Sequence, residues 1–336
     1  MADYTWYVDP AATGSNNGTD WTNAYTSLNA CEAAKNNLTG TDTMTVNCRS
    51  SGAHPVDSAG INWDGSTTSG TITIQVAQAD RAVGKLDSSK YRVEADVGWG
   101  TAFMLNDSPV VVIGIPCKNT AGSGRNCHRS DVASNVYLDC IAYGEADSDL
   151  GGVNGGFSTT YDVGACFFMN CLAIGNAAAG FCNASTNNRY YNCVSIGNSG
   201  QGFRGIGYRT TTLINCYSGG NTGADYNDAE ANVVFSFTTC ASEDGTGGST
   251  IAYSAAGTTG TQFTNITAGS EDVHIASASQ LKDAGTDPSA GFTTDIDGDT
   301  ISTWMIGCDY YVSSDTNKGR DSRRIGIPQN MVKVFQ

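Results

Sequence analysis

The first third of the chain is built from short runs in which apolar and polar residues alternate or apolar residues continue. Gly, Ser, Asp and Asn separate these runs, which cover residues 1–12, 43–49, 71–78, 91–97 and 109–115. Such runs, bounded by turn-forming residues, are typical of β-strands. The chain is therefore predicted to begin as a succession of short strands.

One segment near the N-terminus follows a helical period instead. Four apolar residues recur at roughly helical spacing within residues 27–38, namely Leu28, Cys31, Ala34 and Leu38. Ser27 is suited to cap the first free N–H groups of a helix that starts here. The terminal units of a solenoid need a cover for their core, and we expect this helix to provide one.

An Asn-Cys pair recurs through the middle of the chain at nearly constant spacing. Cys171, Cys193 and Cys216 are 22 and 23 residues apart, and outlying copies carry Cys140 and Cys240. A period of about 20–25 residues with strand-like patterning corresponds to one coil of a solenoid per repeat. The Leu ladder of a leucine-rich repeat is missing. The spacing therefore predicts an all-β fold, a right-handed parallel β-helix.

Two columns of asparagine are expected at the corners of the coils. One column precedes the repeat cysteines and the other follows a Gly, and their members are Asn170, Asn192 and Asn215, and Asn176, Asn198 and Asn221. Stacked coils place equivalent residues about 4.8 Å apart, so amide side chains can hydrogen-bond along the stack. The preceding Gly suits a sharp turn with positive φ.

The direction of the repeat cysteines decides what faces outward. Cysteine is among the most buried residue types, so we expect these side chains to point inward as thiols rather than disulfides. The opposite parity would bury larger groups but expose a column of thiols. With cysteine inward, an apolar outer stripe remains, made of Leu172, Ile174, Val194, Ile196 and Tyr217. Such a stripe is typical of an interaction surface, and we expect it to contact a symmetry mate or a partner protein.

The repeats and both ends of the chain resemble the right-handed parallel β-helix proteins of the pectate-lyase-like superfamily. The opening YVDPAATGSNNGTDWTNAYTSLNAC is similar to the N-terminal cap of this group. Residues 271–285 and 295–312 resemble its closing segment through His274, Ser279, Asp283, Ala284, Gly285, Ile306 and Gly307. Departures from that pattern occur at Gln280, Cys308 and Tyr310. The resemblance implies the fold and leaves the activity open, because this fold hosts lyases, hydrolases, adhesins and virus spikes.

The chain is expected to divide into four parts. Residues 1–40 form the N-terminal strand and helix cap, and residues 41–270 form the β-helix rungs. Residues 271–312 form the closing segment, and residues 313–336 form a C-terminal arm. The arm is first polar and then apolar, which suits either addition to a sheet edge of another subunit or folding back on the last rung.

Composition and charge exclude several classes of function. Charged residues make up 15% of the chain and the formal net charge is −15, so the surface is expected to repel nucleic acid. No run approaches the roughly 18 apolar residues that a membrane span needs. The N-terminus MADYTWYVDP shows no secretory signal.

Few residues are candidates for catalysis. Lyases with this fold use Lys or Arg as the base, often beside Asp residues that hold Ca²⁺, yet no Lys occurs between Lys118 and Lys282. Hydrolysis needs paired carboxylates, and the signatures of related polygalacturonases are missing. The remaining candidates are Arg204, Arg209, Asp225 and Asp228, for all of which we favour a loop without a catalytic role.

The segment DIDGD supplies the candidate metal ligands Asp295, Asp297 and Asp299. An EF-hand loop needs Gly after its third acid and a later Glu, whereas Gly298 here falls between the second and third acids. We favour a structural turn and predict no metal and no cofactor.

The sequence favours a non-enzymatic structural protein on the surface of a virus particle, such as a capsid decoration protein, head fibre or simple spike. The outer stripe and the arm would assemble it into a homo-oligomer, for example a trimer, beside other virion proteins. Two alternatives remain open. One is a polysaccharide lyase or hydrolase, either a depolymerising tailspike or a secreted enzyme acting on a glycan, and the other is a secreted adhesin. Each places the protein on a virion surface or outside the cell.

Overall fold

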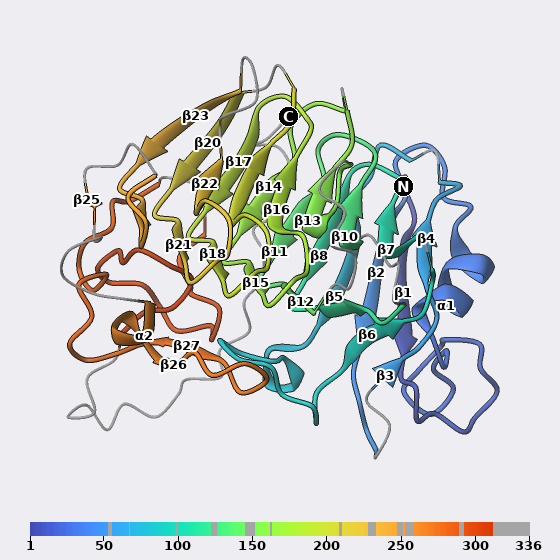
Figure 1. The fold of residues 1–336 in the computed structure, drawn as a ribbon. Coiled ribbons are helices and arrows are strands. Elements are labelled where there is room, and N and C mark those ends of the chain that lie inside the picture. The colour runs from blue at the N-terminus through green and yellow to red at the C-terminus, as the bar shows by residue number, and fades with distance from the viewer. Residues whose placement is uncertain are drawn as a thin grey trace.

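The computed structural model describes residues 1–52, 56–66, 68–98, 100–121, 126–144, 152–161, 163–207, 210–227, 233–246, 251–252, 259–288 and 292–311. Three parallel sheets run side by side along one axis, and between residues 43 and 242 successive strands visit the three sheets in a constant order (Figure 1). The predicted parallel β-helix is therefore confirmed. Within the described residues, no helix is both long and apolar enough to cross a membrane.

The strands of the three sheets follow one another at regular intervals of sequence. The first sheet contains β1 (Asp3–Val8), β2 (Thr43–Cys48), β5 (Ile72–Val76), β8 (Val110–Ile113), β11 (Val136–Leu138), β14 (Phe167–Met169), β17 (Asn188–Tyr191), β20 (Thr210–Ile214) and β23 (Val234–Thr238). The second sheet contains β3 (Val56–Asp57), β6 (Arg92–Ala95), β9 (Pro116–Asn119), β12 (Ile141–Tyr143), β15 (Leu172–Ile174), β18 (Val194–Ile196), β21 (Tyr217–Gly219), β24 (Ala241–Ser242) and β25 (Ile251–Ala252). The third sheet contains β4 (Ile61–Trp63), β7 (Thr101–Leu105), β10 (Asn126–Ser130), β13 (Gly155–Thr159), β16 (Ala179–Asn183), β19 (Phe203–Gly205) and β22 (Tyr226–Asn227).

The helix predicted at the N-terminus forms as α1 (Leu28–Lys35) and lies at the end of the stack where the chain begins (Figure 1). Ser27 caps it, since the Ser27 Oγ accepts the N–H of Ala30 at 3.0 Å. Leu28 and Cys31 are buried in the main core, as the helical stripe predicted, whereas Ala34 is exposed. The remaining elements are a 3-10 turn η1 (Gln78–Asp80), α2 (Thr259–Gln262) and the antiparallel pair β26 (Phe263–Asn265) and β27 (Asp272–Ile275).

The interior of the β-helix is a column of stacked aromatic rings beside a column of thiols. In the third sheet, Phe157, Phe181 and Phe203 stack with ring centroids 5.0 and 4.6 Å apart. The ring of His128 extends this column and stacks on Phe157. Burial lowers the pKa of His128 to about 3, so the imidazole is neutral and packs as an aromatic ring.

The repeat cysteines point inward, as predicted. Cys171, Cys193 and Cys216 are fully buried thiols in the same core as the aromatic column. Each thiol donates to a backbone carbonyl of the preceding coil, for example Cys193 to Phe168 at 3.4 Å. The thiols therefore serve as small packing groups that also satisfy the backbone of the stack.

The residue before each repeat cysteine forms the corner between the first and second sheets. Asn170, Asn192 and Asn215 have φ between 51° and 55°, the left-handed region that Asn tolerates better than most residues. Gly114 and Asp139 occupy the same corner in earlier coils, with φ of 67° and 56°. One residue in the left-handed region thus forms the corner in each of these coils. The regular spacing of the Asn-Cys pairs follows from the repetition of this corner.

The second asparagine column faces inward and forms the predicted ladder. The Nδ2 of Asn176 donates to Asn198 Oδ1 at 2.9 Å, and the Nδ2 of Asn198 donates to Asn221 Oδ1 at 2.8 Å. Gly175 and Gly197 precede two of these residues with φ of 59° and 64°. The sharp turn expected from the Gly-Asn pairs is therefore confirmed.

The expectation that the outer stripe contacts another molecule was wrong. Leu172, Val194 and Tyr217 do face outward, but they are fully buried. The chain itself covers them with β26 and the closing segment, whose buried residues include Phe263, Val273, Ile275, Leu281, Ile296, Met305 and Ile306. In Figure 1 these orange and red elements lie beside β18 and β21. The sequence pattern gave the direction of the stripe but not the identity of its cover.

Two substitutions of Asn215 can separate the contribution of its hydrogen bonds to stability from that of its left-handed backbone. Its amide donates to Asn192 Oδ1 and to the Thr286 carbonyl, and its Oδ1 accepts the Thr286 N–H, at 3.0, 2.8 and 2.9 Å. Asn215→Gly keeps the turn but loses these bonds, and we expect it to lower the free energy of unfolding by about 2 kcal/mol. Asn215→Ala should cost about 1 kcal/mol more, because alanine strains the left-handed corner.

Urea unfolding of both variants measures the two contributions. The usual preference for alanine over glycine should be reversed at this position. An alanine variant as stable as the glycine variant would contradict the strain that we assign to the corner.

Candidate functional site

Asp139, which occupies the corner position before Asn170, forms a buried ion pair with Arg81. Arg81 Nη1 lies 2.7 Å from Asp139 Oδ2, and the two side chains are 6% and 1% exposed. Asn170 donates to the other oxygen, Asp139 Oδ1, at 3.0 Å. Arg81 crosses the preceding corner, where a Cβ on Gly114 would lie 2.4 Å from Arg81 Cδ. The glycine therefore makes room for the cation that pairs with Asp139.

His274, Asp297 and Asp309 come together from three places in the closing segment. His274 lies in β27, and its Nε2 is 2.8 Å from Asp297 Oδ2, while its Nδ1 contacts Asp272. One nitrogen or oxygen from each of His274, Asp297 and Asp309 lies within 4.8 Å of the others. Gln78 of the β-helix also contacts Asp297, so these residues lie where the closing segment meets the β-helix. We call His274, Asp297 and Asp309 the seam cluster.

The ionisation of the seam cluster reflects its burial. The hydrogen bond to Asp297, against the opposing effect of burial, raises the pKa of His274 to about 10, so this imidazole is protonated at neutral pH. Burial raises the pKa of Asp309 to about 7, although the charge of His274 lowers it. Burial and then the carboxylates of Asp309 and Asp297 raise the pKa of Asp295 to about 9. The site thus gathers buried acids around one imidazolium.

The three acids of DIDGD have different surroundings. Asp295 holds the turn, since its Oδ1 accepts the N–H groups of Asp297 and Asp299 at 3.0 and 2.7 Å. Its Oδ2 accepts the N–H of Tyr310 at 2.9 Å. Asp297 belongs to the seam cluster, whereas the backbone of Asp299 pairs with that of Asp295. The structure therefore brings one of the three candidate ligands to a cluster that contains a histidine.

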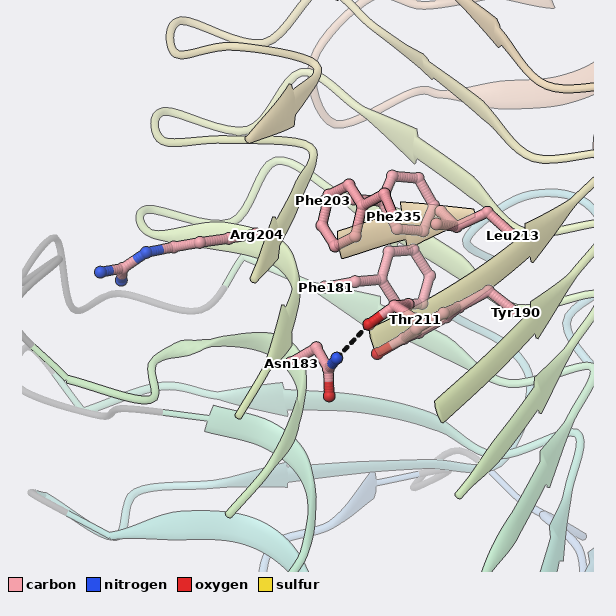
Figure 2. A pocket seen from close by; sticks show the side chains of 8 residues that line it. All are labelled: Phe181, Asn183, Tyr190, Phe203, Arg204, Thr211, Leu213 and Phe235. Carbon is pink, nitrogen blue, oxygen red and sulfur yellow. Dashed lines mark hydrogen bonds between the residues drawn. The ribbon is translucent and has the colours of Figure 1, made fainter. Parts of the chain in front are cut away.

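Arg204 lies on the outer face of the third sheet. Its Nη1 donates to the carbonyl of Gly152 at 3.2 Å, and the residue is 9% exposed. Figure 2 shows the guanidinium directed away from the aromatic column, while Phe181, Phe203 and Tyr190 line a hollow behind it. That hollow has no space for a water molecule. It is part of the packed core rather than a place for a ligand.

Asp225 organises a loop. Its Oδ1 accepts the Asn221 amide at 2.8 Å, and its Oδ2 accepts the N–H groups of Glu243 and Asp244 at 2.8 and 3.0 Å. Burial raises the pKa of Asp225. The other two catalytic candidates, at positions 209 and 228, lie outside the described residues.

Sequence reasoning did not assign His274 and Asp309 to the candidate site. His274 was noted only as one of the residues that resemble the family closing segment, and Asp309 was not singled out. A signal was present, because His274, Asp297 and Asp309 all occur in the segment that resembles a family closing segment. A segment that folds back on itself brings such polar residues together.

Comparison with known proteins supports no identification. The sequence matches no protein-family model and no curated protein. One similar solved structure is described as the crystal structure of pectate lyase Pel9A, with 16% identity, 92% of this chain and 97% of that chain covered, and a TM-score of 0.38. Another is a rhamnogalacturonan lyase, with 16% identity, coverage of 71% and 74%, and a TM-score of 0.31.

Proposed function

We propose that this protein is a non-enzymatic structural protein, a stiff β-helical rod on the surface of a virus particle. The observation that carries the proposal is that polar side chains within the rungs form hydrogen bonds that hold the fold together. Asp139, Asn198 and Asp225 hydrogen-bond to neighbouring coils, corners or loops. Asp225, a catalytic candidate in the sequence, therefore holds the fold together in the same way as Asp139 and Asn198.

The covered outer stripe changes how such a rod would assemble. Because the closing segment covers the stripe, copies of the chain would have to contact one another through other surfaces. The C-terminal arm of residues 313–336 remains the proposed docking element. The arm lies outside the described residues. Antibody raised against the purified chain should label intact virus particles from a culture of the source in immunogold electron microscopy. Antibody confined to membranes or to culture medium without particles would contradict the proposal.

A glycan panel tests the absence of catalysis. Purified protein incubated with uronic-acid-containing and neutral polysaccharides should give no unsaturated product and no new reducing ends. Sustained product formation that is abolished by Arg204→Ala would overturn the proposal. Arg189→Ala is the matched control, because Arg189 is exposed on the first sheet and packs over the Phe167 ring.

Glycan recognition is a second candidate function, favoured by one feature of the third sheet. Arg129 pairs in register with Ser158, which pairs with Cys182, which pairs with Arg204. The two arginines therefore lie in one outward column, three coils or about 14 Å apart. An anionic chain could follow this column, although it would compete with Asp131, which pairs with Arg129 at 2.6 Å. Saturable binding without cleavage in the same panel, weakened in Arg129→Ala and Arg204→Ala, would support this function.

A further inference from the structure

The seam cluster gathers carboxyl groups that are almost fully buried. The side chain of Asp297 is 8% exposed, and Asp309 is 6% exposed. Asp295 lies beside them at 1% exposure. Among the described residues, the cation hydrogen-bonded to this group is His274. The cluster therefore offers buried oxygen ligands beside one imidazole, which is a donor set that a cation can use.

One carboxylate oxygen of the seam cluster has no hydrogen-bond partner. Asp297 Oδ2 bonds to His274, but the buried Oδ1 of Asp297 has no hydrogen-bond partner. Buried carboxylate oxygens are nearly always satisfied. An ion held by the three groups would give this oxygen a partner.

The β-helix holds His274 and Asp297 of the seam cluster in position. Gly84 accepts the N–H of Val273 at 2.8 Å, and its missing side chain leaves room for His274. A Cβ on Gly84 would lie 3.0 Å from the imidazole. Gln78 holds the backbone carbonyl of Asp297 from the same side. The side chain of His274 remains 26% exposed, which gives an ion a route from solvent.

We propose that His274 Nε2, Asp297 and Asp309 bind one divalent transition-metal ion of the Zn²⁺ or Mn²⁺ type, which fastens the closing segment to the β-helix. One imidazole nitrogen with two carboxylates suits these ions, whereas Ca²⁺ prefers six to eight oxygen ligands. Asp272 would hold the Nδ1–H of His274, as carboxylates do behind metal-binding histidines. Binding releases the Nε2 proton to solvent, and the ion takes its place between His274 and Asp297.

Zinc titration of chelator-treated full-length protein tests the site. We expect one Zn²⁺ per chain by metal analysis and a rise in melting temperature of about 4 °C at roughly a hundredfold excess over Kd. His274→Gln and Asp309→Asn should each lose the bound ion and the rise. Asp131→Asn is the matched control, because Asp131 pairs with Arg129 near the third sheet, and it should keep both.

The twelve cysteines of the chain are competing ligands, and Co²⁺ distinguishes them. Binding at the seam cluster should give d–d absorption without a thiolate charge-transfer band, and this readout uses the folded wild-type protein. A thiolate band, no bound ion, or stabilisation by Ca²⁺ but not by Zn²⁺ would overturn the proposal. Retention of the ion in folded His274→Gln would also overturn it.

Discussion

Replacing Arg81 with alanine is expected to lower the free energy of unfolding by about 3–5 kcal/mol, because it leaves a buried acid without its cation. Arg81 contacts Asp139 at 2.7 Å, and both side chains are almost fully buried. Arg81 also donates to the carbonyl of Val76 at 2.8 Å. Its loss therefore removes an ion pair and a hydrogen bond to the end of β5 in the same coil.

The rescue of this variant is the sharper part of the prediction. Later coils carry Asn170, Asn192 and Asn215 at the corner where this coil carries Asp139. Adding Asp139→Asn to Arg81→Ala removes the unpaired charge, and we expect it to recover about half of the lost stability, since breaking a buried pair costs mainly through the orphaned charge. Urea unfolding of the two single variants and the double variant measures this coupling.

The pH dependence gives an independent readout. Burial raises the pKa of Asp139 to about 7 in the native protein, even though Arg81 lowers it. Without Arg81 the folded pKa should be higher still, so the folded state binds a proton more tightly than the unfolded state does. The stability of both proteins should therefore fall with rising pH up to the folded pKa, which is about 7 in the wild type and higher in Arg81→Ala, so the stability difference between them should widen above pH 7. A defect that is constant with pH and unrelieved by Asp139→Asn would contradict the role assigned to the pair.

Phe181→Ala is expected to cost about 3–5 kcal/mol, the range for removal of a large aromatic side chain from a packed core. Phe181 is 1% exposed and stacks between Phe157 and Phe203. It also meets Tyr190 edge-on, with centroids 5.4 Å apart. The residue thus joins three consecutive coils and two sheets, and the stacked backbone cannot close the resulting cavity.

Tyr161→Ala is the matched control for this truncation. Tyr161 is 50% exposed, and surface substitutions of this kind usually change stability by no more than about 0.5 kcal/mol. Both variants are compared with the wild type by urea unfolding and by near-ultraviolet circular dichroism. A loss below about 1 kcal/mol in Phe181→Ala would show that the coils repack without the column.

The repeat pattern predicted the parts of the fold that depend on neighbouring coils. The spacing of Cys171, Cys193 and Cys216 gave the coil length, and the burial preference of cysteine gave the side-chain parity. Both were confirmed, because stacking imposes the same environment on equivalent positions of each coil. Local sequence is sufficient where the interaction partner lies one repeat away.

The features that sequence did not predict depend on contacts between distant positions. Asn170 meets the Thr294 carbonyl across 124 residues, and no periodicity signals such a contact. The same fold-back covers the outer stripe and brings His274 to Asp297. The sequence identified Asp297 in DIDGD as a candidate ligand, but its place in a cluster depends on His274, which lies 23 residues away in the chain.

The closing segment also changes how the solenoid should come apart. An array whose repeats touch only their neighbours frays from its ends, because each unit leaves alone. Here one continuous segment reaches Gln78 through Asp297, and Thr239 through Thr286. A coil between these points cannot open without releasing a segment shared with the others. The covering of the outer stripe therefore makes the rod melt as one cooperative unit rather than coil by coil.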